Sequence, residues 1–295
     1  MKELSGTGIA LCTPFTADKQ VDFSSLEKLV ENNISNGVDY LVALGTTSET
    51  ATLSKSEKKS VVDCILSSNG NRIPVVLGIG GNDTKKVNAE IKETNLNDFS
   101  AILSVSPYYN KPNQTGLYQH YEYLAKHTDA NIIIYNVPSR TGSNINPETT
   151  LALANNFSNL IGIKDAPFDF RQFIDVLSNK PNDFMVISGD DLLAVPAILA
   201  GAVGVISVTA QAIPAYFSKM INHARVGNTT EANQMMYEII TLIDLMFEEG
   251  NPTGIKALLS EKGIANPYSR LPVVEASENL RDKILNCVNH INFKL

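Results

Sequence analysis

The stretch Leu160-Ile161-Gly162-Ile163-Lys164 is a short apolar run that ends on a lysine, and runs of this kind recur along the chain. Its length and β-branched residues are typical of a buried strand. Similar runs occur at residues 8–12, 40–44, 74–78, 101–105, 132–135, 184–187 and 204–208. Longer amphipathic stretches lie between them, for example at residues 24–35, 56–68, 84–95 and 116–127. This alternation indicates parallel strands joined by helices.

Eight strand and helix units predict a closed (β/α)8 barrel rather than a doubly wound open sheet. The open sheet would favour a nucleotide fingerprint, but the glycine-rich stretch at residues 78–83 has Asp83 where a third glycine belongs. We therefore interpret that stretch as a strand-to-helix turn. Beyond residue 225 the strand pattern stops, and residues 229–249, 253–261 and 276–289 are predicted to be helical. The expected organisation is a barrel over residues 1–225, followed by a small α-helical region over residues 226–295.

Composition narrows the class of protein. Hydrophobic residues make up 43% and charged residues 19% of the 295 residues, which fits a globular interior. The net charge of -7 argues against nucleic acid as a partner. Cys12, Cys64 and Cys287 form no C-x-x-C pair, which argues against a disulfide framework and a zinc site. The first eight residues lack the apolar segment of a signal peptide, and no run is long enough to cross a membrane, so we expect a cytoplasmic protein.

Polar residues at the ends of the predicted strands are the candidates for chemistry, because barrel enzymes build their sites at the carboxyl ends of the strands. These residues lie at 45–49, 106–110, 135–140, 164–165, 188–191 and 206–207. The sequence therefore predicts one site with contributions from several strands.

Lys164 is the candidate nucleophile of this site. Its strand predicts an amine at a poorly hydrated barrel mouth, where desolvation disfavours the ammonium form and leaves the free amine that attacks carbonyl groups. The alternative is a structural lysine that is ion-paired with Asp165 or another carboxylate, and strand position alone leaves both open. Tyr135, at the end of the preceding strand, is either a proton shuttle or a packed tyrosine with one hydrogen bond.

Two further features suggest binding of carboxylates. The turn containing Thr46 and Thr47 offers hydroxyls and backbone N–H groups, although an ordinary strand-to-helix turn has the same composition. Arg140 could hold a second carboxylate with two hydrogen bonds, or form a surface ion pair.

Five motifs together resemble the dihydrodipicolinate synthase family. They are Gly45-Thr46-Thr47-Ser48-Glu49, Pro107-Tyr108-Tyr109-Asn110-Lys111-Pro112, Tyr135-Asn136-Val137-Pro138-Ser139-Arg140-Thr141, Ile161-Gly162-Ile163-Lys164-Asp165 and Gly204-Val205-Ile206-Ser207-Val208. They cover almost the whole chain in the family's order. The resemblance implies a barrel enzyme of lysine and diaminopimelate synthesis that condenses pyruvate with L-aspartate 4-semialdehyde. It implies no metal and no external cofactor, because pyruvate would be held as an imine on Lys164.

The resemblance also implies a role for each site residue. Thr46 and Thr47 would bind the pyruvate carboxylate, while Tyr135, Thr47 and Tyr109 would relay protons. Tyr109 would come from the adjacent subunit of a homotetramer formed as a dimer of dimers. Arg140 would hold the carboxylate of the semialdehyde. Gly189 and Ile206 would line the pyruvate pocket through their backbones.

Two departures from the family pattern concern the turn and the C-terminal helices. Ser48 stands where the family usually has glycine, which adds a side chain next to Thr46 and Thr47, the residues expected to bind a carboxylate. We expect it to be tolerated. Residues 251–256 read Asn-Pro-Thr-Gly-Ile-Lys in place of the usual N-P-I-P-V-K. We expect this segment to lie away from the chemistry.

A third departure concerns the allosteric site at which lysine inhibits some members of the family. Lys55, Lys58 and Lys86 stand where those members have two histidines and a glutamate, whereas Asn82 and Tyr108 match. Three ammonium groups would repel a cationic effector. Our hypothesis is that lysine inhibits this enzyme weakly or not at all.

Other functions remain as alternatives. The nearest is another pyruvate-dependent aldolase, such as N-acetylneuraminate lyase or a 2-keto-3-deoxy sugar acid aldolase; Tyr109 and Arg140 favour the small charged semialdehyde instead. A metal-dependent aldolase needs ligands at the strand ends, but all four histidines fall in predicted helices. A pyridoxal phosphate enzyme is disfavoured by Asp190 and Asp191, which would repel a phosphate. A non-enzymatic barrel would keep Lys164 for structure alone.

Overall fold

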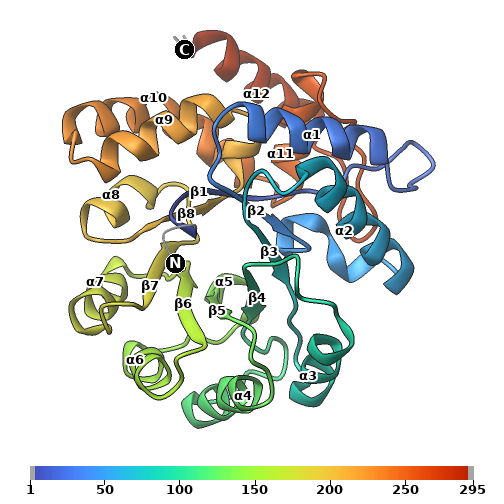
Figure 1. Cartoon of the computed structure of the whole chain (residues 1–295). Coiled ribbons are helices and arrows are strands. Elements are labelled where there is room, and N and C mark those ends of the chain that lie inside the picture. Colours follow the sequence, from blue (N-terminus) through green and yellow to red (C-terminus); the bar gives the residue numbers. More distant parts are fainter. Residues whose placement is uncertain (1–3, 292–295) are drawn as a thin grey trace.

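The computed structural model describes residues 4–291 and contains a closed barrel of eight parallel strands in the order β1 to β8 (Figure 1). Pairing of β1 with β8 closes the barrel. The strands are β1 (Gly6–Ala10), β2 (Tyr40–Ala43), β3 (Val75–Gly78), β4 (Ala101–Val105), β5 (Ile132–Asn136), β6 (Leu160–Asp165), β7 (Met185–Ser188) and β8 (Gly204–Ser207). The expected (β/α)8 fold is confirmed. Residues 1–3 of the predicted barrel and residues 292–295 of the predicted C-terminal region lie outside the described residues.

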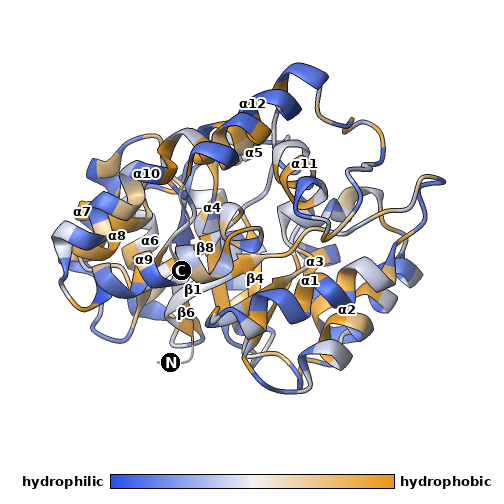
Figure 2. Ribbon diagram, turned by 90° about the horizontal axis from the view of Figure 1, so that it is seen from above, coloured by the Kyte–Doolittle hydropathy of each residue, from blue (hydrophilic) through white to orange (hydrophobic). Residues whose placement is uncertain are grey.

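Helices surround the barrel. They are α1 (Phe23–Ser35), α2 (Lys55–Asn69), α3 (Thr84–Glu93), α4 (Gln114–Lys126), α5 (Pro138–Thr141), α6 (Pro147–Asn156), α7 (Phe170–Asn179), α8 (Ala194–Leu199), α9 (Pro214–Arg225), α10 (Thr229–Phe247), α11 (Thr253–Glu261) and α12 (Glu278–His290). Figure 2 shows hydrophobic colouring on barrel strands such as β4 and hydrophilic colouring along outer helices such as α12. None of the helices described between residues 4 and 291 has the length and apolar character that a membrane crossing requires.

The strands form where the apolar runs predict them, because strands of a parallel barrel are buried on both faces and read as continuous apolar segments. Six of the eight strands are buried throughout, and β3 and β4 are buried except for a half-buried last residue. The fully buried strand β6 includes Lys164. The register aligns Tyr135 of β5 with Lys164 of β6 and Lys164 with Ile187 of β7. Aligned residues of neighbouring strands face the same side of the sheet, so this register brings Tyr135 and Lys164 to one level of the barrel.

Side-chain caps define where the outer helices begin. Asp83 accepts hydrogen bonds from the backbone N–H groups of Lys85 and Lys86 at the start of α3. The interpretation of residues 78–83 as a strand-to-helix turn is therefore confirmed. Ser54 and Glu57 form a reciprocal capping box at the start of α2, which satisfies two backbone donors.

The three C-terminal helices pack on one another, and α10 also contacts α8 and α9 of the barrel. The helical character predicted beyond residue 225 is confirmed by α10, α11 and α12. We propose that residues 226–295 be treated as a separate region, because the break between α9 and α10 falls at residues 226–228. The contacts of α10 join this region closely to the barrel.

Candidate active site

Lys164 points toward the ring of Tyr135 inside the barrel mouth. Its Nζ atom lies 4.4 Å from the centre of that ring. Only 5% of Lys164 and 6% of Tyr135 is exposed. A lysine that is buried to this extent is uncommon unless its amine has a partner or a chemical task.

Asp165 does not pair with Lys164, because successive residues of a strand face opposite sides. Its carboxylate accepts hydrogen bonds from Asn136 Nδ2 at 2.8 Å and from Gln172 Nε2 at 3.1 Å. Gln172 belongs to α7, so Asp165 faces the layer of helices. Burial raises the pKa of Asp165 to about 6, while the two hydrogen bonds oppose that rise. Within the described residues no carboxylate forms an ion pair with Lys164, which contradicts the structural alternative considered for this lysine.

The turn that is predicted to bind the pyruvate carboxylate, residues 45–49, follows β2 and is called the carboxylate turn. It contains a single turn of 3-10 helix, η2 (Thr46–Ser48). Thr47 is fully buried. The Ser48 hydroxyl donates to the carbonyl of Leu11 at 2.6 Å, and the Ser48 carbonyl accepts from Thr13 Oγ1 at 2.8 Å. The extra side chain at position 48 thus ties the turn to the segment after β1. This gives a physical reason for the tolerance that we expect at this position.

A cavity of about 460 Å³ opens at this end of the barrel. Six of the predicted site residues line it: Thr46, Thr47, Tyr135, Arg140, Lys164 and Gly189. The segments that supply them are separate in sequence and meet only because the strands close into a barrel. The other two, Ile206 and Tyr109, do not line the cavity: Ile206 is buried in β8, and Tyr109 lies outside it. The roles of all eight residues stay predictions.

Asn251 is a site residue that the sequence analysis missed. Its Nδ2 atom donates to Thr47 Oγ1 at 3.0 Å, and its carbonyl lies 3.5 Å from a guanidinium nitrogen of Arg140. The expectation that residues 251–256 lie away from the chemistry is therefore wrong. The reason is that the segment between α10 and α11 lies against the carboxylate turn. This contact joins residues 204 positions apart, and no local pattern encodes it.

Helix α10 also reaches the cavity. Ile243, Asp244 and Phe247 from its C-terminal half line the wall, as does Glu248 just after the helix. Phe168, from the loop after β6, lies at the same cavity with 79% of its surface exposed. Sequence reasoning confined to strand ends does not identify these residues, because they come from helices and loops.

The loop that carries Tyr108 and Tyr109 projects from the barrel after β4. Tyr109 is 88% exposed and has a left-handed φ of 74°. Asn82 Nδ2 donates to the carbonyl of Tyr108 at 3.1 Å, so the predicted allosteric positions Asn82 and Tyr108 lie together. Because Tyr109 is 88% exposed, its ring makes few contacts within its own chain.

The other predicted allosteric positions, Lys55, Lys58 and Lys86, line a groove between α2 and α3. Lys55 is ion-paired with Glu93 at 2.8 Å, and Lys86 Nζ lies 3.7 Å from Asp83. These acidic partners weaken the repulsion that three ammonium groups would otherwise exert on a cation. The hypothesis of weak lysine inhibition stays a prediction.

Comparison with known proteins agrees with this geometry. The sequence model of the Dihydrodipicolinate synthetase family matches residues 3–291. The chain belongs to this family. The chain is 48% identical over 284 residues to a 4-hydroxy-tetrahydrodipicolinate synthase from Flavobacterium psychrophilum. The aligned residues cover 96% of this chain and 97% of the relative.

Solved structures of the family have the same fold. The crystal structure of a chloride-inhibited dihydrodipicolinate synthase from Acinetobacter baumannii in complex with pyruvate is similar, with a TM-score of 0.94 and 37% identity. The similarity covers 97% of this family member and 98% of that chain. A monomeric dihydrodipicolinate synthase variant has a TM-score of 0.94 and 36% identity, over 97% of this chain and 96% of the other.

Proposed function

We propose that the chain is a lyase of amino-acid biosynthesis that condenses pyruvate with L-aspartate 4-semialdehyde to give 4-hydroxy-tetrahydrodipicolinate. The observation that carries the proposal is the buried amine of Lys164, which shares one cavity with the carboxylate turn and has no ion-pair partner among the described residues. Family membership and the curated relative support the same reaction. The comparisons do not favour a sugar-acid aldolase.

The reaction that we propose begins with attack of the Lys164 amine on the ketone carbon of pyruvate. Loss of water gives an imine, and loss of a methyl proton converts the imine into an enamine. The enamine carbon then bonds to the aldehyde carbon of the semialdehyde, whose oxygen takes up a proton. Finally the amino group of the second substrate attacks the imine carbon, which closes the ring and releases Lys164. The protonated imine is itself the electron sink, so the proposal includes no metal and no external cofactor.

Each remaining site residue has a task in this proposal. Thr46 and Thr47 bind the pyruvate carboxylate through hydroxyl and backbone N–H groups, and Arg140 binds the carboxylate of the semialdehyde. Tyr135, Thr47 and Tyr109 relay protons to and from the adduct. Gly189 and Ile206 form part of the pyruvate pocket.

We further propose that the active enzyme is a cytoplasmic homotetramer, in which Tyr109 completes the site of a neighbouring subunit. The 88% exposure of Tyr109 supports this arrangement, because Tyr109 does not line the cavity of its own chain and is accessible to a neighbouring subunit. Because one solved structure of the family is of a monomeric variant, the oligomeric state of this chain has to be measured. Analytical ultracentrifugation measures the state directly, and a monomer with full activity would contradict the proposed role of Tyr109.

Borohydride trapping tests the reaction. We expect incubation with pyruvate and borohydride to give one covalent adduct, which peptide mass spectrometry locates at Lys164. Lys164→Arg is the matched control, because it keeps a long basic side chain but cannot form the imine. A coupled assay that offers aspartate semialdehyde and, separately, a sugar aldehyde identifies the acceptor. No adduct in the unaltered enzyme, or turnover with the sugar alone, would refute the proposed function.

A further inference from the structure

The carboxylate turn has a backbone conformation that its own residues do not favour. Leu44, just before the turn, and Glu49, at its end, have left-handed φ angles of 54° and 53°. Residues with a side chain rarely adopt this region, and they keep it only where the surrounding structure holds them. The contacts of Glu49 therefore bear on how the turn is maintained.

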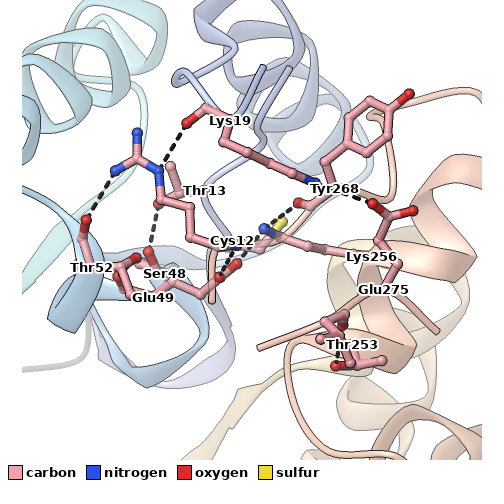
Figure 3. Close-up of polar contacts among 12 residues, drawn as sticks. Cys12, Thr13, Lys19, Ser48, Glu49, Thr52, Thr253, Lys256, Tyr268 and Glu275 are labelled. Atoms are coloured by element: carbon pink, nitrogen blue, oxygen red, sulfur yellow. Dashed lines mark hydrogen bonds and ion pairs between the residues drawn. The ribbon is translucent and has the colours of Figure 1, made fainter. Parts of the chain in front are cut away.

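Glu49 forms a buried ion pair with Lys256 of α11 (Figure 3). The two side chains are 2% and 1% exposed. Glu49 Oε1 accepts from Lys256 Nζ, and Glu49 Oε2 accepts from the backbone N–H of Arg270 at 3.1 Å. Lys256 Nζ also donates to the carbonyl of Tyr268 at 2.9 Å and lies 4.3 Å from the ring centre of Phe15. Both oxygens of the carboxylate are thus held by the C-terminal region.

Arg270 strengthens the same connection on its outer side. Its guanidinium donates to the carbonyls of Lys19 and Thr52, each at 2.9 Å, and to Glu57 at 2.5 Å. Thr52 lies three positions beyond the carboxylate turn, and Glu57 lies in the first turn of α2. The segment after the turn is therefore bound to the C-terminal region at several points.

Stability alone is a weak explanation for the ion pair. Replacing a buried pair by apolar residues of similar size is often neutral or stabilising, whereas removing one partner is costly. The best-attested use of such a pair is to select one arrangement of the chain among several. Here the arrangement that it selects is the turn whose Thr46 and Thr47 face the Lys164 cavity.

We propose that Lys256, through its buried pair with Glu49, is a positioning residue that holds the carboxylate turn in its pyruvate-binding conformation. Helix α11 is thereby part of the pyruvate site. This inference rests on the proposed function, since it assigns the carboxylate of pyruvate to the turn. It predicts that loss of the pair weakens pyruvate binding while the semialdehyde, held by Arg140, is affected much less.

Three variants of the full-length enzyme test the proposal. Lys256→Met keeps the length of the side chain and removes its charge. The double variant Glu49→Gln/Lys256→Met removes both charges and avoids a buried unpaired ion. Leu124→Ala is the control, because Leu124 is fully buried in α4, on the side of the barrel opposite α11 in Figure 1. For each variant we measure the melting temperature, the pyruvate concentration for half-maximal borohydride trapping, and KM for the semialdehyde at saturating pyruvate.

We expect Lys256→Met to raise the half-saturating pyruvate concentration about 10-fold, the loss that follows when hydrogen bonds to a charged group are misaligned. The double variant should recover most of the melting temperature and still need about 10-fold more pyruvate. Leu124→Ala should lower the melting temperature without raising the half-saturating pyruvate concentration. In all three variants, KM for the semialdehyde should stay within about 2-fold of its value in the unaltered enzyme.

Unchanged pyruvate dependence in the double variant, or an equal rise in the Leu124→Ala control, would overturn the proposal. Failure of the double variant to fold would also overturn it, because the pair would then serve the fold as a whole. If Lys256→Met alone does not fold, the double variant decides. Absence of any adduct in the unaltered enzyme would instead refute the proposed function, so the two failures are distinguishable.

Discussion

Replacing Gly189 with alanine should disturb the reactive lysine itself. Gly189 has no left-handed φ, so an alanine can adopt its backbone conformation and the added methyl group is the whole perturbation. That methyl carbon would lie 3.0 Å from the Cβ of Ala166, 3.1 Å from Cε of Lys164 and 3.2 Å from the carbonyl oxygen of Asp165. Favourable carbon contacts are at about 3.5–4.0 Å, so the end of the lysine side chain has to retreat by roughly 0.4 Å or more.

The size of the effect follows from this displacement. A shift of about 1 Å at a reacting group costs on the order of 100-fold in rate, so we expect Gly189→Ala to slow adduct formation about 10-fold. Overpacking should also lower the free energy of unfolding by about 1–3 kcal/mol. Rapid borohydride quenching gives the rate of adduct formation, and urea unfolding gives the stability.

A second substitution separates the two effects. Gly189→Ala/Ala166→Gly removes the clash with Ala166 but leaves the methyl against Lys164. Stability should recover in part, while adduct formation should stay slow. A wild-type rate of adduct formation in Gly189→Ala, at any stability, would refute the steric reasoning.

Four further results are expected. Tyr109→Phe should reduce turnover by roughly 100-fold while pyruvate trapping remains detectable, and unchanged turnover would remove Tyr109 from the relay. Asn251→Ala should raise KM for pyruvate by about 3- to 10-fold through loss of its hydrogen bond to Thr47, whereas an unchanged KM in steady-state assays would deny it a part in the site. The folded-state pKa of Asp165, about 6, exceeds its ordinary value of 3.8, so its contribution to stability is complete below pH 4 and is lost as pH rises through 6. Relative to Asp165→Asn, the unaltered enzyme should therefore lose about 2 kcal/mol of unfolding free energy between pH 4 and 7 in urea titrations. Parallel stability curves for the two proteins would contradict this assignment. Lysine should inhibit weakly or not at all, and half-maximal inhibition at sub-millimolar lysine would contradict the hypothesis.

Local patterns were sufficient to predict the fold. Strands β4 and β6 begin at the residues that the apolar runs indicate, because burial on both faces of a parallel strand requires a continuous apolar segment. The caps of the outer helices are equally local, since Ser54 and Glu57 satisfy backbone donors within one helical turn. The prediction of the barrel follows from repetition of such segments along the chain.

Strand position also identified Lys164 and Tyr135, but it did not decide between a reactive and an ion-paired lysine. The structure shows that Lys164 is not ion-paired with Asp165, because side chains alternate along β6. Lys164 faces the cavity and Asp165 faces α7, where Asn136 and Gln172 hold its carboxylate. The sequence alone predicts that Lys164 and Asp165 point to opposite faces of their strand, because side chains alternate along a strand. Which of the two faces borders the cavity depends on how the strands close into the barrel.

The sequence by itself determined the barrel, the order of its strands and the polar residues at their ends, because these depend on periodicity and on neighbours within a few positions. Only the tertiary structure decided that residues from the C-terminal region line the cavity and contact the carboxylate turn. Asn251 reaches Thr47 across 204 positions, and Lys256 reaches Glu49 across 207. Contacts at such separations arise from packing of complete elements, and no local pattern records which elements will meet.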